Sequence, residues 1–253
     1  MRYEYKYYVP NIHLRKLKEV ILPFLETDSF AVKSGGEYTV RSIYFDTPDF
    51  DMYHTKLEGF KHRYKVRLRG YNQGDEDSLV FMEIKRKYEH PILKNRASAT
   101  FGDVISMFHG MPVEKVMEGK AAHMADNARR FFYQIFSHQM KPVVNVIYER
   151  EPYHSKFEDP DNNFRLTIDK NLRSSPYPDV ADLFVDKRVQ YALHNHFILE
   201  IKFNHYMPVW TKPLVAHMNL KRESASKYCI CIDSHRDINP DSRVDMLIKG
   251  GRF

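Results

Sequence analysis

Cysteine, glycine and long apolar runs are scarce in this chain, and each scarcity excludes a class of protein. The 253 residues include only two cysteines, Cys229 and Cys231, within one Cys-Ile-Cys run. That spacing is too local for a useful disulfide, so we expect free thiols in a reducing compartment. The ten glycines form neither a P-loop nor a Gly-rich dinucleotide-binding loop. The thirteen histidines are scattered and do not form the His-Glu-x-x-His pattern of a zinc enzyme.

Membrane-spanning and disordered classes are also disfavoured. No apolar run approaches the roughly twenty residues of a membrane-spanning helix, and the first ten residues lack the apolar core of a signal peptide. Apolar residues make up 43% of the chain and charged residues 28%, which favours a folded protein. There is no low-complexity linker and no repeat of fixed period. We therefore expect a single domain over residues 1–253, in the cytoplasm or as the soluble part of a membrane-associated system.

Positive charge is in excess, and it clusters in residues 61–96. The chain has 39 Lys and Arg against 33 Asp and Glu, a net charge of +6, which favours an anionic partner. Residues 61–96 predict two strands joined by a loop, followed by a third strand. Successive strand side chains point to opposite faces. One face therefore collects almost only cations: Arg63, Lys65, Arg67 and Arg69, then Glu83, Lys85 and Lys87, then Lys94 and Arg96.

The positive charge of such a face must be offset by negative charge or by solvent, because like charges side by side on a sheet repel each other. A bound polyanion is the simplest compensation. The alternative is a solvated face whose long Lys and Arg side chains lie in water, and for one strand alone this alternative is favoured. The pattern recurs, however, in three further predicted strands. Their polar faces carry Glu4 and Lys6, Arg165, and Glu200 and Lys202.

Alternation and helical periodicity predict the other elements. Further strands are expected at 2–9, 38–46, 141–154, 164–172, 182–189 and 197–203, and helices at 12–25, 50–57, 101–108, 127–138, 210–220 and 223–233. Strands with one apolar and one ionic face, together with amphipathic helices, predict an α+β fold. The sheet could be open to water or closed into a barrel with its ionic face inside, and the residues alone do not choose between the two.

Seven segments carry a family resemblance: YEYKYYVP, VRSIYFDTPDFDMYHTKLEGFKHRYKVRLRGY, FMEIKRK, KNR, FRLTIDKNL, FILEIKF and SKYC. In this order they resemble the catalytic domain of the vacuolar transporter chaperone (VTC) polyphosphate polymerases, within the triphosphate tunnel, or CYTH-like, superfamily. The resemblance extends from the first strand to about Tyr228. It implies an α+β fold with a closed antiparallel β-tunnel of about eight strands, helices packed outside and a helical C-terminal plug.

The resemblance also implies an activity. Members of the polymerase branch are metal-dependent ATP-polyphosphate phosphotransferases, which transfer the terminal phosphoryl group of ATP onto a growing polyphosphate chain. It implies ATP and polyphosphate as substrates, Mn²⁺ or Mg²⁺ as cofactor, and a membrane-protein partner, with no nucleic acid bound. Two alternatives remain open: a triphosphate or nucleoside triphosphate hydrolase of the same fold, and a non-catalytic polyphosphate or inositol-phosphate sensor or single-stranded nucleic-acid binder.

Residue by residue, the resemblance assigns a phosphate site. Phosphoryl transfer needs converging cations for phosphate oxygens and a carboxylate to hold the metal. Glu200 matches the family's metal-binding carboxylate, and Glu4 and Glu83 could support the metal or position the lysines. The start Tyr-Glu-Tyr-Lys has only one of the two acids of the hydrolase signature Glu-x-Glu-x-Lys, which favours the polymerase. The catalytic cations would be Lys6, Arg67, Arg69, Lys85, Lys94, Arg165 and Lys227, and Lys87, Arg96, Lys202 and Lys221 would add to substrate binding.

Overall fold

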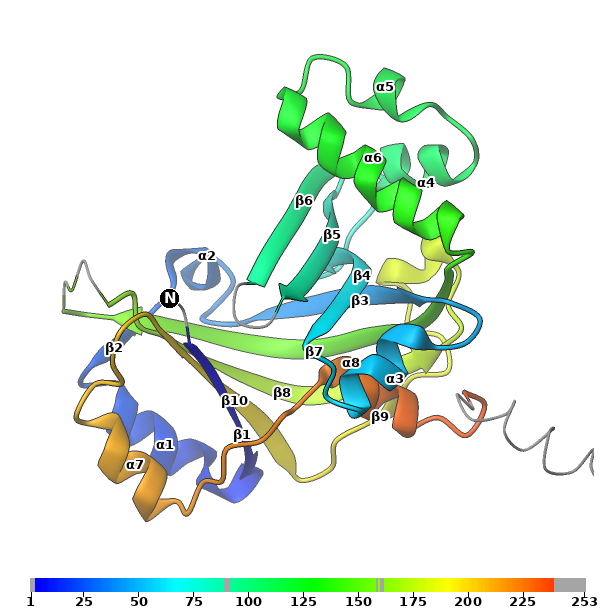
Figure 1. Ribbon diagram of the computed structural model, residues 1–253. Helices are drawn as coiled ribbons and strands as arrows, with labels where there is room; N and C mark the ends of the chain where they lie inside the picture. The colour runs from blue at the N-terminus through cyan, green and yellow to red at the C-terminus, as the bar shows by residue number, and fades with distance from the viewer. Residues whose placement is uncertain (1–2, 89–91, 158, 160–161, 239–253) are drawn as a thin grey trace, which may run out of the picture. The chain divides into compact units, whose positions relative to one another are not determined.

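A computed structural model describes residues 3–88, 92–157, 159 and 162–238 (Figure 1). The chain divides into two compact units. The first unit comprises Met1–Val40, Ile147–Arg173 and Tyr191–Lys227, and the second comprises Arg41–Val146, Ser174–Gln190 and Tyr228–Phe253. None of the helices in the described ranges is long and apolar enough to cross a membrane.

The elements follow one another along the chain as strands interrupted by mostly short helices. The strands are β1 Tyr3–Pro10, β2 Leu25–Thr27, β3 Tyr38–Asp46, β4 His62–Tyr71, β5 Leu79–Tyr88, β6 Ile92–Thr100, β7 Lys141–Ser155, β8 Arg165–Pro176, β9 Gln190–Tyr191 and β10 His196–Phe203. The α-helices are α1 Leu14–Ile21, α2 Ser29–Val32, α3 Asp51–Leu57, α4 Phe101–Phe108, α5 Val113–Val116, α6 Ala122–Ser137, α7 Thr211–His217 and α8 Lys227–Asp233. The described residues also form the 3₁₀-helices η1 Asn11–His13 and η2 Val180–Phe184.

The strands pair in the order β1-β10-β8-β7-β3-β4-β5-β6, with β2 on β7 and β9 on β8. Pairing is antiparallel between β1 and β10, β10 and β8, β2 and β7, β4 and β5, and β5 and β6. The predicted α+β class with an antiparallel sheet is confirmed, with ten strands in the described part of the chain where about eight were expected. Within the described residues, β1 and β6 stand at the two ends of this order. Both cysteines are buried free thiols, as expected.

Most predicted elements are present, and the differences have local causes. The strand at 38–46 and the helix at 101–108 have the predicted bounds. The predicted strand at 182–189 is wrong, because Asp179 and Asp182 form a capping box that starts η2 instead. The ring of Phe184 then packs so closely that a Cβ at Gly70 would lie 2.5 Å from it. The predicted helix at 223–233 begins only at Lys227.

In the first unit, the apolar faces of β1, β10 and β8 form a core with α1 and α7. Leu17 and Ile21 of α1 and Leu214 of α7 are buried against strand residues such as Tyr7 and Leu199. Figure 1 shows α1 and α7 side by side. Each large apolar side chain that is fully buried stabilises the fold by roughly 1.5–3 kcal/mol. The opposite, ionic face of the same strands is therefore left for other contacts.

In the second unit, the apolar faces of β4 and β5 are buried in the same way. Val66 and Leu68 of β4 and Met82 and Ile84 of β5 are almost inaccessible to solvent. Helix α6 contacts all three strands of the β4–β6 group, and its buried ring of Phe131 lies 5.8 Å from that of Phe45 on β3. Burial of these apolar faces fixes the register, since a shift by one residue would exchange the two faces.

Candidate functional site

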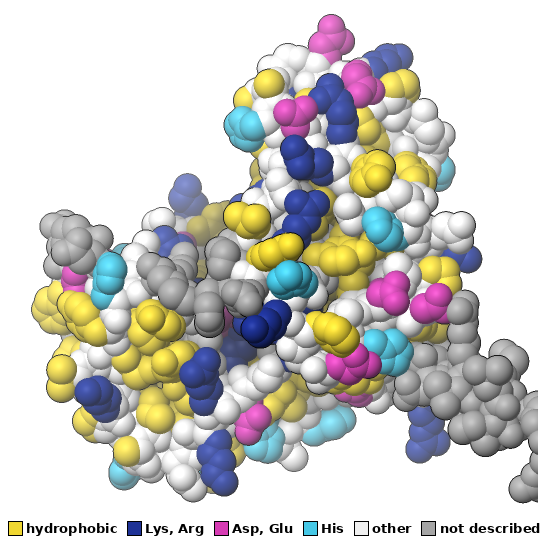
Figure 2. Space-filling model, in the orientation of Figure 1, with side chains coloured by type: hydrophobic (Ala, Val, Ile, Leu, Met, Phe, Trp, Pro, Cys, Tyr) yellow, Lys and Arg dark blue, Asp and Glu magenta, His cyan; other side chains and the backbone are white. Residues whose placement is uncertain are grey.

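The predicted cationic face of β4, β5 and β6 is present, and the strand register arranges its charges in rows. Lys65, Lys85 and Lys94 lie opposite one another in one row, and Arg67, Glu83 and Arg96 form the next. Within the described residues, this face carries four cations on β4, two on β5 and two on β6, against the single carboxylate of Glu83. Figure 2 shows Lys and Arg side chains one after another in the region of β5 and β6. We call it the β4–β6 face.

Glu83 is the carboxylate with which several cations of the β4–β6 face form ion pairs. Its side chain is buried, with only 1% exposed. The Nε and Nη2 atoms of Arg67 lie 2.8 and 2.7 Å from its Oε2 atom. On the other oxygen, Oε1, Lys94 Nζ lies at 2.6 Å and Arg96 Nε at 3.3 Å. Burial raises the pKa of Glu83, but Arg67, Arg69 and Lys94 outweigh it and hold the pKa far below its ordinary value. Glu83 is therefore an anion that fixes the surrounding cations in place.

Tyr44 of β3 joins the same cluster. Its hydroxyl accepts a hydrogen bond of 2.9 Å from Arg67 Nη1, and its ring stacks on Tyr228 of α8 at 5.0 Å. Burial raises the pKa of Tyr44, but the charges of Arg67, Lys65 and Arg69 lower it to about 7. The sequence gave no signal that singles out Tyr44, because the chain has 17 tyrosines and only the tertiary structure brings this one to Arg67.

In the first unit, β1 and β10 bring two predicted acids and two predicted cations together. Glu4 pairs in register with Lys202, and Lys6 with Glu200. Lys6 Nζ lies 2.9 Å from Glu4 Oε1 and 3.9 Å from Glu200 Oε2. Lys202 Nζ forms an ion pair with Glu200 Oε1 and lies 3.9 Å from Glu4 Oε2. The two carboxylates thus share the two lysines.

The buried Glu200 is ionised. Burial raises its pKa, but the charges of Lys202, Lys6, Lys227 and Arg150 hold the pKa well below its ordinary value. The same physical balance applies to Glu83 in the second unit. A buried carboxylate stays ionised only where several neighbouring cations offset the free-energy cost of removing its charge from water.

Asp169 on β8 forms a third buried cluster, with Arg150 of β7 and Lys227 at the start of α8. Arg150 donates through Nε and Nη2 to the two oxygens of Asp169, both at 2.7 Å. Lys227 Nζ lies 2.6 Å from Asp169 Oδ2 and 4.8 Å from the ring centre of Tyr148. Arg150 and Asp169 were not assigned from the sequence. The sequence did contain a signal for the faces of both residues. Arg150 stands two residues after Tyr148 and so shares its strand face, and Asp169 shares its strand face with Arg165.

Three further predicted site residues lie outside these clusters, and Arg69 lies at the edge of the Glu83 cluster. Arg165 is exposed, pairs in register with Lys202, and donates to Asn163 Oδ1 at 3.2 Å. Lys87 is opposite Arg63 on the β4–β6 face, and Lys221 is exposed beside a cavity. Arg69 lies 4.0 Å from Glu83 Oε2 and donates to Ser42 Oγ at 3.1 Å.

The three predicted metal-binding acids differ in their surroundings. The parts of the chain that the structure describes contain no group of three or more His, Cys, Asp and Glu side chains arranged to hold a metal. Glu4 and Glu200 share Lys6 and Lys202, and their carboxylate oxygens are the donor type that Mg²⁺ and Mn²⁺ prefer. Glu83 has cations on both of its oxygens, so its arrangement suits the positioning of Arg67 and Lys94.

Known proteins resemble this chain in sequence. The model of the VTC domain family matches residues 1–236. A vacuolar transporter chaperone complex subunit 4 from Trypanosoma cruzi is 28% identical over 157 residues, which are 53% of this chain and 19% of that protein. The subunit of the same name from Trypanosoma brucei brucei is 26% identical over 197 residues, which are 64% of this chain and 24% of that protein. The chain thus matches about a fifth to a quarter of the length of these relatives.

Two solved structures also align with most of the chain. One is a candidate adenylyl cyclase from Hippeastrum with a dominant triphosphatase activity, at 13% identity and a TM-score of 0.48, with 91% of this chain and 94% of that chain covered. The other is a candidate adenylate cyclase from Vibrio parahaemolyticus, at 11% identity and a TM-score of 0.41, with 90% and 96% covered.

Proposed function

Because the chain belongs to the VTC domain family, we propose that it is a metal-dependent polyphosphate polymerase. The enzyme transfers the terminal phosphoryl group of ATP to the end of a growing polyphosphate chain. The family membership supports a phosphate-directed function, and the start Tyr-Glu-Tyr-Lys, with a single acid before Lys6, favours transfer to polyphosphate over plain hydrolysis.

One observation carries the proposal: the β4–β6 face has eight cations and one carboxylate within the described residues. Like charges in register on neighbouring strands, such as Lys65, Lys85 and Lys94, repel one another. Glu83 offsets part of this repulsion through Lys94, and a bound polyanion would lower it further. A chain of phosphates supplies negative charges at short, regular intervals, so it matches a face on which cations recur at every second residue.

The cations have distinct roles in this reaction. The forks of Arg67 and Arg69 bind phosphate oxygens in pairs, whereas Lys85 and Lys94 act as point charges. Glu83 holds Arg67 and Lys94 in place before the substrate arrives, so less reorganisation is needed in the transition state. The acceptor is a terminal phosphate whose oxygens are already ionised, and the transfer therefore needs positioning more than a general base.

In the first unit, the proposed phosphate ligands are Lys6, Lys202 and Lys227, and we add Arg150 because it lies with Lys227 on Asp169. Glu200 and Glu4 would hold Mn²⁺ or Mg²⁺, which would supply positive charge to offset the negative charge of the phosphates. Lys6 and Lys202, which lie beside both carboxylates, would contact the phosphates. We propose Lys87 and Arg165 as outlying contacts for a longer polyphosphate chain, and Lys221 as a further substrate contact.

The setting of the enzyme is also part of the proposal. We propose that residues 1–253 act as one domain in the cytoplasm and work beside a membrane-protein partner. The names of the two curated relatives, as subunits of a complex, support a partner.

The test is incubation of the purified chain with ATP and Mn²⁺, with polyphosphate length read on a gel and free phosphate measured in parallel. Long chains released together with ADP are the expected result. Free phosphate without chains would overturn the polymerase in favour of a hydrolase. Tight binding of tripolyphosphate without turnover would instead indicate a sensor.

A further inference from the structure

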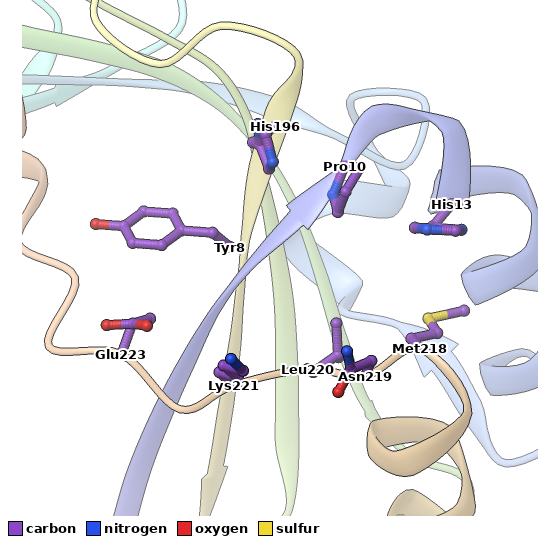
Figure 3. A pocket seen from close by; sticks show the side chains of 9 residues that line it. All are labelled: Tyr8, Pro10, His13, His196, Met218, Asn219, Leu220, Lys221 and Glu223. Atoms are coloured by element: carbon purple, nitrogen blue, oxygen red, sulfur yellow. The ribbon is translucent and has the colours of Figure 1, made fainter.

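A cavity of about 430 Å³ lies in the first unit where β1 ends. Its volume is in the range of small-molecule sites, roughly 300–1,000 Å³. Figure 3 shows its lining around the end of β1, with His196 on one side and the segment 218–223 on the other. The lining includes Tyr8, Pro10, His13, His196, Lys221 and Glu223.

The cavity adjoins the ionic face of β1. Tyr8 lies two residues after Lys6 on the same face of the strand, about 7 Å further along at the usual rise. The backbone N–H of Glu223 donates to the carbonyl oxygen of Lys6 at 2.8 Å, and Tyr7 and Arg222 form an isolated bridge. The segment 221–223 therefore runs along the free edge of β1. This brings Lys221 beside Tyr8 and Glu223 beside Lys6.

The lining suits a ligand with a flat ring and hydroxyl groups. Tyr8 and His196 supply rings on which a base can stack. Glu223 supplies a carboxylate, which in other nucleotide sites accepts hydrogen bonds from ribose hydroxyls. Pro10 and Met218 add apolar surface. A bare phosphate chain would meet the negative charge of Glu223 and gain nothing from the rings, so the lining disfavours polyphosphate itself.

We propose that this cavity binds the nucleoside part of the ATP donor, with its triphosphate directed towards Lys6 and Lys202. This inference rests on the proposed function and specifies where its donor is recognised. Tyr8 and His196 hold the base, Glu223 holds the ribose, and Lys221 contacts the phosphate nearest the ribose. The nucleoside contacts are thus separate from the phosphate contacts of Lys6.

Two ligands distinguish the nucleoside contacts from the phosphate contacts: ATP contains the nucleoside, and inorganic tripolyphosphate lacks it. Dissociation constants for both would be measured by calorimetry with Mn²⁺ for the full chain and for Tyr8→Leu and His196→Ala. The matched control is His194→Ala, which removes an exposed imidazole just before β10 that does not line the cavity. Loss of a base stack weakens binding by roughly 1–3 kcal/mol, so each cavity variant is expected to bind ATP about tenfold more weakly. Its affinity for tripolyphosphate stays unchanged, which also shows that the variant is folded.

The outcomes are distinct. If both ligands lose affinity equally, the cavity contacts phosphate rather than the nucleoside, and the inference is overturned. If neither affinity changes while the wild-type chain makes polyphosphate, the inference is overturned and the proposed function stands. If the wild-type chain binds neither ligand, the proposed function fails and the nucleoside site fails with it.

Discussion

Arg67 and Glu83 face each other across β4 and β5, and two guanidinium nitrogens of Arg67 lie within 2.8 Å of one carboxylate oxygen. The third nitrogen, Nη1, donates to the hydroxyl of Tyr44. All three nitrogens of the fork are therefore directed by neighbours before any substrate binds. Such preorganisation lets a protein stabilise the charge of a phosphoryl group without first moving its hydrogen-bond donors.

Arg67→Ala and Lys85→Ala are each expected to reduce polyphosphate synthesis by about 100-fold or more, the usual cost of losing one preorganised donor. Folding should change little, because Glu83 keeps Lys94 and Arg96 as partners after Arg67 is removed. Turnover and thermal unfolding would be measured together. Lys115→Ala, which removes an exposed cation from α5, serves as control. Turnover at the wild-type rate in either variant would remove the β4–β6 face from the site.

Glu83→Gln is expected to destabilise the chain by up to about 3–5 kcal/mol at neutral pH, because it leaves the largely buried Arg67 and Arg69 without their buried carboxylate. The folded pKa of Glu83 is lowered from its ordinary value of 4.5. Its stabilising effect is therefore complete above pH 4.5 and is lost as the pH falls through the lower, folded value. Unfolding free energies across this pH range would test the effect. The gap between wild type and variant should narrow in acid, and a constant gap would contradict the assignment.

Tyr44 is expected to titrate near neutral pH, about three units below an ordinary tyrosine, since its folded pKa is about 7 against 10.0. The stabilisation by its phenolate is complete above pH 10 and lost as the pH falls to 7. Tyrosinate absorbance as a function of pH, compared between wild type and Tyr44→Phe, measures this directly. Tyr133→Phe, at an exposed position of α6, is the control. Bound triphosphate should raise the transition, because it neutralises Arg67 and Lys65.

Glu200→Ala is expected to lose activity together with its dependence on Mn²⁺, because it removes a proposed metal ligand. The Mn²⁺ concentration needed for half-maximal activity would be measured for the variant and for wild type. Glu19→Ala, which removes an exposed carboxylate paired with Arg15 on α1, is the matched control. If Mn²⁺ still activates the Glu200 variant at the wild-type concentration, Glu200 does not bind the metal.

Strand faces were predictable to a large extent, and strand partners were not. The alternation in residues 61–96 correctly predicted which side chains share the β4–β6 face, because that assignment depends only on the two-residue period of a strand. Tyr44 was missed because its role depends on Arg67, which belongs to another strand. Asp179 and Asp182, whose capping box replaced the predicted strand at 182–189, show a local signal that was present and overlooked.

The sequence by itself determined the alternation of ionic and apolar residues, hence the α+β class and the resemblance to the VTC domain family. Only the tertiary structure decided which charges meet. Lys6 and Glu200 are 194 positions apart, and their pairing follows from the register of β1 and β10. That register is set by burial of the apolar faces against α1 and α7, since a shift by one residue would expose that core. The period of a strand is a local property of the chain, whereas its register is a property of the packed molecule.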